Sequence, residues 1–231
     1  LLPKKRQNLM FSATFSNDIK KLSEEFLTNP KLIEVARSNA ASDKVTQKVY
    51  QLDKEGKDSF LAKLLLESNS EQTIVFTKTK LTASRLARQL VREGIAADAI
   101  HGDKSQQERM QALEAFKQGK VTTLVATDVA ARGLDIDQLP MVINFELPSA
   151  PEDYVHRIGR TGRAGASGTA ISLVCPEEEK YLKEIEKLIK REISREVAVV
   201  AARPRERAKE AREPRAEATD RKPAAARSPA P

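Results

Sequence analysis

Residues 73–100 read TIVFTKTKLTASRLARQLVREGIAADAI, and this stretch decides the fold class. Its opening, Thr73–Phe76, is a short apolar run typical of a buried strand, and Ala97–Ile100 is a second such run. Between the two runs leucines recur at helical spacing, until Gly94 ends the segment. A strand, a helix and another strand in this order are the repeating unit of a parallel sheet.

The same alternation continues on both sides of this stretch. The predicted strands are Val45–Leu52, Thr73–Phe76, Ala97–Ile100, Val121–Ala126, Met141–Phe145 and Ala170–Val174. The predicted helices are Ser59–Glu67, Leu81–Val91, Ser105–Phe116, Pro151–Ile158 and Glu177–Glu192. Val- and Ile-rich strands that alternate with helices indicate parallel strands covered on both faces. We therefore expect a doubly wound α/β domain at 44–202, with ligands bound beyond the carboxyl ends of its strands.

Residues 1–36 form a smaller piece before this domain. Leu9–Phe11 is predicted to be a strand, and a helix follows in which Ile19, Leu22 and Phe26 share one face. The polar residues 37–43 are predicted to be a linker. Because residues 1–36 are too few for a domain, we interpret them as the last strand and helix of a preceding one.

The composition excludes two classes of protein. A single cysteine, Cys175, cannot build a disulfide framework, and no apolar run approaches the roughly 18 residues of a membrane span. The single cysteine fits a reducing compartment, so we expect a cytoplasmic protein. The 40 Lys+Arg against 33 Asp+Glu give a formal charge of +7, which is a weak indication of an acidic partner such as nucleic acid.

The segment 203–231 differs in composition from the rest of the chain. It contains five prolines and no Val, Ile, Leu, Met, Phe, Tyr, Trp or Cys. Nine Lys/Arg against five Asp/Glu give it a charge of +4 and leave +3 on residues 1–202. Since it cannot bury enough apolar surface to offset the entropy lost on ordering, we expect a disordered basic tail. The tail either tethers a polyanion or serves only as a solubilising terminus.

The segment HRIGRTGR at 156–163 is the main candidate for chemistry, with three arginines and two glycines. Arg160 and Arg163 are three residues apart, so a helical turn would aim both guanidinium groups at one place. Planar guanidinium groups suit bidentate contact with phosphate oxygens, and in phosphoryl transfer they stabilise charge on the γ-phosphate. The alternative is a solvated, arginine-rich turn.

Two further segments follow predicted strands. TDVAARGLDI at 127–136 carries Asp135 after a polar loop, where its carboxylate either accepts hydrogen bonds from a ribose or caps a turn. GDKSQQER at 102–109 opens a helix whose Ser105 and Glu108 form a capping box. A helix N-terminus is a ready phosphate site, and the side chains beside it face either an RNA backbone or plain protein surface.

Taken together, these segments resemble the later motifs of a known family. Those motifs are Ser12–Thr14, Ile74–Thr77, Gln106 with Arg109, Thr127–Ile136 and His156–Arg163. In order and spacing they are similar to motifs of the DEAD-box ATP-dependent RNA helicases, with the bacterial RhlE-type branch the most similar. The resemblance covers about residues 1–195. It implies that 44–202 is the second of two RecA-like domains and that residues 1–36 are a remnant of the first.

The resemblance also implies a role for individual residues. The implied catalytic residues are Arg160 and Arg163, as arginine fingers that reach the γ-phosphate when the two domains close. The implied nucleotide-binding residues are Gly133, Asp135, Arg160 and Arg163. The implied RNA-binding residues are Thr77, Gly102, Gln106, Arg109, Thr127 and Asp128. The implied residues of interdomain coupling are Ser12, Thr14 and His156.

The sequence contains neither a GxxxxGK[ST] P-loop nor an Asp-Glu-Ala-Asp segment. In the family both belong to the first RecA-like domain and hold ATP with Mg²⁺, so we expect this chain to supply half of a split active site and no metal ligand. The chain alone is expected to be inactive. The full-length protein is expected to bind RNA and ATP across both domains, hydrolyse ATP and unwind short RNA duplexes.

Two alternatives stay open. One is a non-catalytic RNA-binding module of the same fold, and the other is a DNA-acting superfamily 2 helicase. A P-loop and an Asp-Glu-Ala-Asp segment upstream would favour the enzyme over the module. A comparison of RNA-stimulated with DNA-stimulated ATPase would separate the two nucleic acids.

Overall fold

The structure is a computed structural model of the chain. It describes Pro3 and residues 5–12, 17–33, 45–68, 72–136, 138–162 and 167–198. The predictions that concern Thr14, Arg163, the linker 37–43 and the tail 203–231 lie outside the described residues. Within the described part, no helix combines the length and the apolar character needed to cross a membrane.

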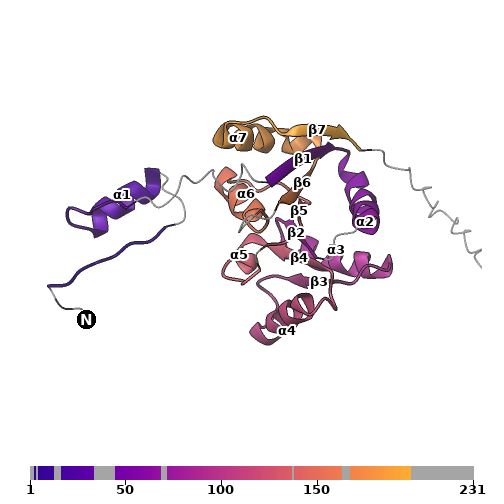
Figure 1. Ribbon diagram of the computed structural model, residues 1–231, viewed down its shortest axis with the longest axis horizontal. Coiled ribbons are helices and arrows are strands. Elements are labelled where there is room, and N and C mark those ends of the chain that lie inside the picture. Colours follow the sequence, from indigo (N-terminus) through magenta and orange to yellow (C-terminus); the bar gives the residue numbers. More distant parts are fainter. Residues whose placement is uncertain are drawn as a thin grey trace, which may run out of the picture. The chain divides into compact units, whose positions relative to one another are not determined.

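A seven-stranded sheet of parallel strands forms the centre of the domain, in the order β3-β4-β2-β5-β6-β1-β7 (Figure 1). The strands are β1 Val45–Gln51, β2 Thr73–Thr77, β3 Ala97–Ile100, β4 Thr123–Thr127, β5 Met141–Asn144, β6 Gly168–Val174 and β7 Ser194–Val197. The predicted α/β architecture with a parallel sheet is therefore confirmed.

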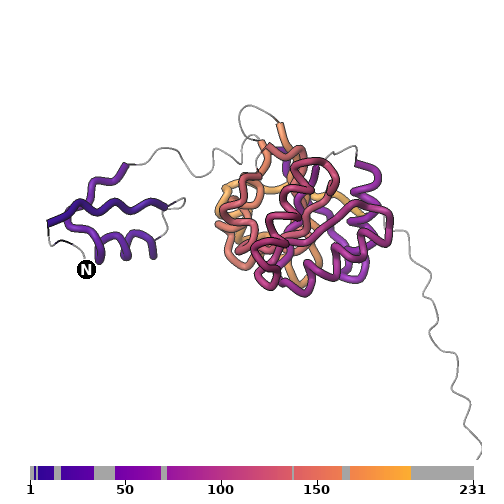
Figure 2. Tube along the Cα trace, turned by 90° about the horizontal axis from the view of Figure 1, so that it is seen from below, coloured from indigo at the N-terminus to yellow at the C-terminus, as the bar shows by residue number. Residues whose placement is uncertain are grey.

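Helices cover both faces of this sheet (Figures 1 and 2). They are α2 Lys57–Glu67, α3 Lys80–Arg92, α4 Gln106–Lys117, α5 Asp128–Ala131, α6 Pro151–Ile158 and α7 Glu179–Ile189. Side chains alternate along each strand, so Val75 of β2 packs with α2 and α3, whereas Ile74 and Phe76 pack with α4 and α5. Helices α6 and α7 cover β1 and β6 on the latter face.

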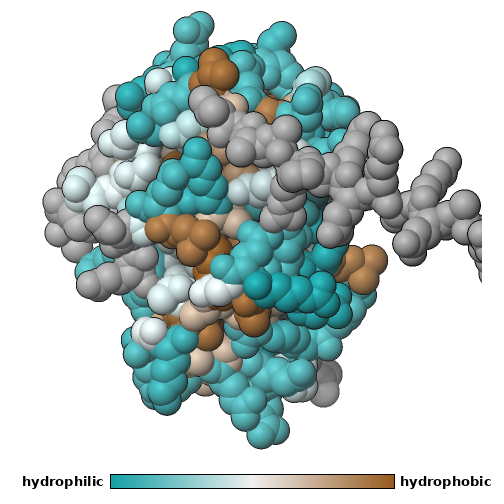
Figure 3. Space-filling model, turned by 90° about the vertical axis from the view of Figure 1, so that its right-hand side faces the viewer, coloured by the Kyte–Doolittle hydropathy of each residue, from teal (hydrophilic) through white to brown (hydrophobic). Residues whose placement is uncertain are grey.

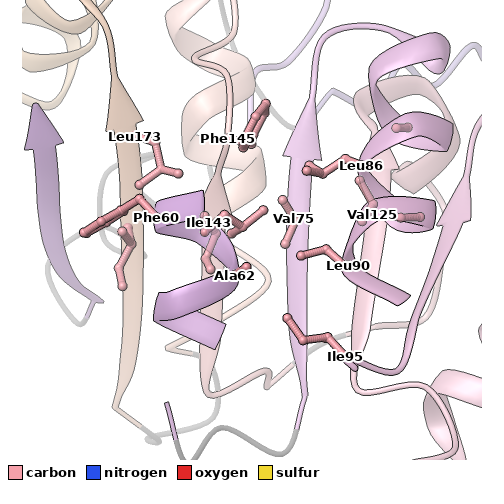
Figure 4. Packing of buried hydrophobic residues seen from close by; sticks show 14 of the residues in the cluster. Phe60, Ala62, Val75, Leu86, Leu90, Ile95, Val125, Ile143, Phe145 and Leu173 are labelled. Atoms are coloured by element: carbon pink, nitrogen blue, oxygen red, sulfur yellow. The ribbon is translucent and has the colours of Figure 1, made fainter. Parts of the chain in front are cut away.

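The α2–α3 face shows how the core holds the sheet. Phe60, Leu86 and Leu90 extend from the two helices toward Val75 and Ile143 on central strands, and all five are buried (Figure 4). Burying one large apolar side chain stabilises a fold by about 1.5–3 kcal/mol. The outer side of the molecule on which α2 and α3 lie is mostly hydrophilic (Figure 3).

Two helices begin at side-chain caps that hold the loops beyond the strands. Thr79 Oγ1 accepts the backbone N–H of Thr82 at 3.0 Å at the start of α3. The predicted capping box of α4 is confirmed, because Ser105 Oγ accepts the backbone N–H of Glu108 at 3.2 Å and Glu108 Oε2 accepts the backbone N–H of Ser105 at 2.8 Å. The hydrogen bonds from Ser105 lower the pKa of the Glu108 carboxyl group.

Three features of the structure differ from the sequence-based predictions. Residues 194–197 form β7, which was not predicted because this short edge strand is polar and largely exposed. The predicted loop at 127–136 contains α5, which at four residues is too short to show helical periodicity. The predicted strand Leu9–Phe11 is not formed, since a strand needs a hydrogen-bonded neighbour and the described residues offer it none.

The N-terminal helix α1, Asn17–Phe26, forms where the sequence predicts a helix. Taken by itself it carries no buried side chain. The assignment of residues 1–36 to a preceding domain stays a prediction.

Candidate functional site

The carboxyl ends of β3, β4 and β2 lie side by side because these parallel strands are neighbours in the sheet. The register pairs Ala126 with both Phe76 and Ile100, so the three following loops leave the sheet at one level. All six residues predicted to bind RNA lie at these strand ends, in the loops or on the first turn of α4. The structure thus brings the residues predicted to bind RNA to the end of the sheet at which the strands terminate. We call this end the carboxyl edge.

Arg157 is the central side chain of this region, and it is only 1% exposed. Its Nε and Nη2 donate to the two carboxylate oxygens of Asp128, at 2.6 and 2.8 Å. Its Nη1 donates to Asn144 Oδ1 at 3.1 Å and to the carbonyl oxygen of Glu146 at 2.7 Å. The guanidinium also lies 5.1 Å from the ring centroid of Phe76. Through these contacts Arg157 joins α6 to the carboxyl ends of β2, β4 and β5.

This pair changes the interpretation of Asp128. Both of its carboxylate oxygens accept hydrogen bonds from Arg157, so the carboxylate already has a structural role within the domain, and only its remaining lone pairs are open to a donor from RNA. Arg157 has no predicted role of its own. The sequence does contain a signal for a structural role. Arg157 stands three residues after Tyr154 and one before Ile158, which places it on the buried face of α6.

A surface hollow lies beside the Arg157–Asp128 pair. It is lined by Phe76, Asp128, Ala131, Arg132, Asp153, His156, Arg157 and Arg160. Arg132 Nη2 donates to Asp153 Oδ1 at 2.6 Å, and His156 Nδ1 lies 3.8 Å from the same oxygen. Arg160 Nη1 donates to the carbonyl oxygen of Leu134 at 3.3 Å. The predicted catalytic and coupling residues Arg160 and His156 thus share one basic hollow.

The two other residues predicted to bind nucleotide lie on the exposed loop after α5. Gly133 has a φ of +73°, a backbone conformation that favours glycine. The side chain of Asp135 is 91% exposed, and its Oδ2 lies 3.0 Å from Lys117 Nζ. An exposed ion pair of this kind is weak, so the carboxylate stays accessible to a hydroxyl donor.

The residues predicted to bind RNA differ in exposure. Thr77 is fully buried and its hydroxyl donates to the carbonyl oxygen of Thr79 at 3.3 Å, which favours a role in shaping the loop. Thr127 is half-buried at the end of β4. Gly102 is exposed, and a Cβ built on it meets no atom within 4 Å. Packing within the domain therefore does not require glycine at position 102.

Gln106 and Arg109 lie on the first turn of α4, on the same face. Arg109 Nη1 donates to Gln106 Oε1 at 3.4 Å, and its Nη2 donates to the carbonyl oxygen of Ala130 at 3.3 Å. The arginine thereby spans from α4 to α5.

Three buried side-chain nitrogen atoms have no hydrogen-bond partner among the described residues. They are His101 Nδ1, Arg109 Nε and His156 Nε2. Unpaired buried polar groups are rare and often mark functional sites. Arg109 and His156 are predicted site residues, whereas His101, whose Nε2 lies 2.6 Å from Ser84 Oγ, is not.

Sequence comparisons find relatives of this chain among the RNA helicases. The family model described as "Helicase conserved C-terminal domain" matches residues 56–165. The ATP-dependent RNA helicase RhlB of Pseudomonas syringae is 44% identical over 189 residues, which cover 82% of this chain and 48% of that protein. The DEAD-box ATP-dependent RNA helicase CshA of Bacillus subtilis is 43% identical over 194 residues, 84% of this chain and 39% of that protein. The chain thus spans less than half the length of these relatives.

Solved structures give the same result. The Escherichia coli DEAD-box protein SrmB, in complex with the regulator of ribonuclease activity A, is 38% identical with a TM-score of 0.64, and the match covers 67% of this chain and 92% of that one. The chain belongs to the DEAD-box family. A second DEAD-box structure, Saccharomyces cerevisiae Dbp5 with RNA and ADP BeF3, matches with a TM-score of 0.77 at 33% identity over 85% of this chain and 52% of that one.

The DEAD-box comparisons leave two finer predictions as they were. The relatives named above are RhlB and CshA proteins, so the RhlE-type branch stays a prediction. Ser12 is exposed in the N-terminal segment, and its coupling role also stays a prediction.

Within the described part of this DEAD-box domain, no group of three or more His, Cys, Asp or Glu side chains is placed to hold a metal ion. Burial raises the pKa of the Cys175 thiol to about 11, and hydrogen bonds with neighbouring glutamates add to the shift. The thiol is therefore protonated at neutral pH and poorly suited to act as a nucleophile.

Proposed function

We propose that this chain is the C-terminal RecA-like part of an ATP-dependent RNA helicase and works with an N-terminal RecA-like domain that carries the P-loop and the Mg²⁺ site. The names of the relatives RhlB and CshA support this activity. The observation that carries the proposal is the Arg157–Asp128 pair, which joins the strand ends of the predicted RNA surface to the helix that precedes Arg160.

On the RNA side, the proposed contacts are mainly to the sugar-phosphate backbone. Gly102 leaves space for a phosphate to approach the main chain, and Gln106 and Arg109 offer an amide and a guanidinium on the turn that follows. Contacts to phosphates and 2′-hydroxyls carry little base specificity. Binding is therefore expected to be largely independent of RNA sequence.

On the nucleotide side, Asp135 is proposed to accept hydrogen bonds from the ribose, and Arg160 with Arg163 to contact the γ-phosphate. A guanidinium aimed at this phosphate stabilises the charge that develops in phosphoryl transfer. In the structure Arg160 Nη1 is held by the Leu134 carbonyl group, one residue from Asp135. This contact keeps the arginine next to the loop proposed to bind the ribose.

Coupling between the two ligands is proposed to arise from domain closure. If RNA and ATP each bind across both RecA-like domains, each favours the closed arrangement and thereby strengthens binding of the other. The side chain of His156, which is 38% exposed, is proposed to contact the other domain.

The test uses the full-length protein and measures ATP hydrolysis with single-stranded RNA and with DNA of the same sequence. RNA is expected to raise the turnover and DNA to have little effect. Equal stimulation by DNA would contradict the RNA assignment and favour a DNA-acting helicase. No hydrolysis under any condition, with RNA still bound, would favour a non-catalytic RNA-binding module.

A further inference from the structure

A basic and aromatic cluster lies next to the carboxyl edge and is absent from the predicted RNA set. Lys78 Nζ lies 4.1 Å from the centroid of the Tyr181 ring, and Lys180 Nζ lies 4.9 Å from the same centroid. Lys78 follows β2, whereas Tyr181 and Lys180 belong to the first turn of α7. Two positive charges therefore converge on one ring from separate parts of the chain.

No carboxylate of a described residue lies within 4.0 Å of either ammonium group, the limit for an ion pair. Glu179, which precedes Lys180, is instead paired with Arg195 at 2.8 Å. Glu177, Glu178 and Glu184 are the other acidic side chains at this end of α7, and Glu178 is paired with Lys57. Because like charges repel, an anion placed between the two ammonium groups lowers the electrostatic energy of the cluster.

The cluster is held in place from both sides. The backbone N–H of Lys78 donates to Glu146 Oε2 at 2.7 Å, which fixes the main chain directly after Thr77. Tyr181 is half-buried against the core formed by α6 and α7, whereas both lysines are exposed. A half-buried ring with two exposed ammonium groups over it suits a ligand that carries both a flat ring and a phosphate.

We propose that Lys78, Lys180 and Tyr181 bind one additional nucleotide of single-stranded RNA, continuous with the carboxyl edge. This inference rests on the proposed RNA-binding function. On binding, the ammonium groups move from the Tyr181 ring to a phosphate, and a base stacks on the ring in their place. Such combinations of basic groups and aromatic rings bind single strands with little regard to sequence.

The experiment measures the affinity of the full-length protein for a fluorescent oligouridylate at several salt concentrations. Tyr181→Ala is expected to weaken binding by about five-fold or more, and Tyr181→Phe, which keeps the ring, to stay close to the wild type. Lys78→Gln and Lys180→Gln are each expected to reduce the slope of log affinity against log salt by about 0.7. Lys187→Gln, the same charge change near the other end of α7, is the matched control and should change neither quantity.

An Arg109→Ala variant separates this inference from the proposed function. Weaker binding by Arg109→Ala together with unchanged binding by Tyr181→Ala and Lys78→Gln would leave the proposed function standing and overturn the additional site. Unchanged binding by all three variants would overturn both. Photo-crosslinking of a thiouridine-substituted strand is expected to label Tyr181, and labelling of the carboxyl edge without Tyr181 would also overturn the site.

Discussion

Arg157 and Asp128 form a bidentate ion pair, with N···O distances of 2.6 and 2.8 Å, in which the arginine is almost completely buried. Removal of Asp128 leaves a buried guanidinium without its counter-charge. We expect Asp128→Ala to lower the free energy of unfolding by about 3–5 kcal/mol, measured by urea denaturation. The control is Arg132→Ala, which breaks the exposed pair with Asp153 and should cost about 0–1 kcal/mol. Equal losses for the two variants would contradict the structural role of the buried pair.

Replacement of Arg160 tests the proposed nucleotide contact. Arg160→Ala is expected to lower RNA-stimulated ATP turnover of the full-length protein by about 10³-fold or more, because charge on the γ-phosphate loses its stabilising group. Its affinity for RNA without nucleotide should stay the same, since Arg160 is not among the proposed RNA contacts. A variant with normal turnover would contradict the arginine-finger role.

A substitution at Gly102 tests RNA binding separately from the stability of the domain. A Cβ at this position meets no atom within 4 Å and its φ is not positive, so Gly102→Ala should leave the free energy of unfolding unchanged or slightly raised. RNA affinity should fall if a phosphate approaches the main chain there. The control is Gly119→Ala, which has open space but a φ of +73°. It should lose about 1 kcal/mol of stability without a change in RNA affinity. Normal RNA affinity of Gly102→Ala would rule out a close backbone contact at this position.

The buried hydroxyl of Tyr154 leads us to expect that the stability of the domain depends on pH. Burial raises the pKa of its hydroxyl above the ordinary value of about 10. The folded state then keeps a proton that the unfolded state loses, so stability present below about pH 10 falls as the pH rises further. In Tyr154→Phe this fall should be less steep in urea titrations at alkaline pH. The variant also loses the 2.8 Å hydrogen bond to Gln47, so its stability at neutral pH should be lower by about 1 kcal/mol. An equally steep alkaline fall would contradict the assignment to Tyr154.

Much of the fold was predictable because burial imposes a pattern on the sequence. The apolar runs of β2 and β5 had to be continuous, since helices cover both of their faces. β7 left no such pattern, because an edge strand with one neighbour can be polar.

The candidate site was predictable to a different extent. Its residues stand after strand ends, and parallel strands bring those ends together whatever lies between them in the chain. The partners of each polar side chain were not predictable. An arginine that binds a ligand and one that binds Asp128 look the same in the sequence. Only the buried position of Arg157 identifies it as the one that binds Asp128.

Glu146 connects the loop after β2 with helix α6. Its carboxylate holds the backbone of Lys78 on the RNA side, and its carbonyl oxygen holds Arg157 on the helix that leads to Arg160. One residue and two hydrogen bonds of 2.7 Å therefore connect the loop after β2 with α6, and a shift of that loop on proposed RNA binding would be passed along them. If RNA and ATP bind as proposed, strain at the RNA would reach the arginine proposed to contact ATP without any change in the fold of the domain.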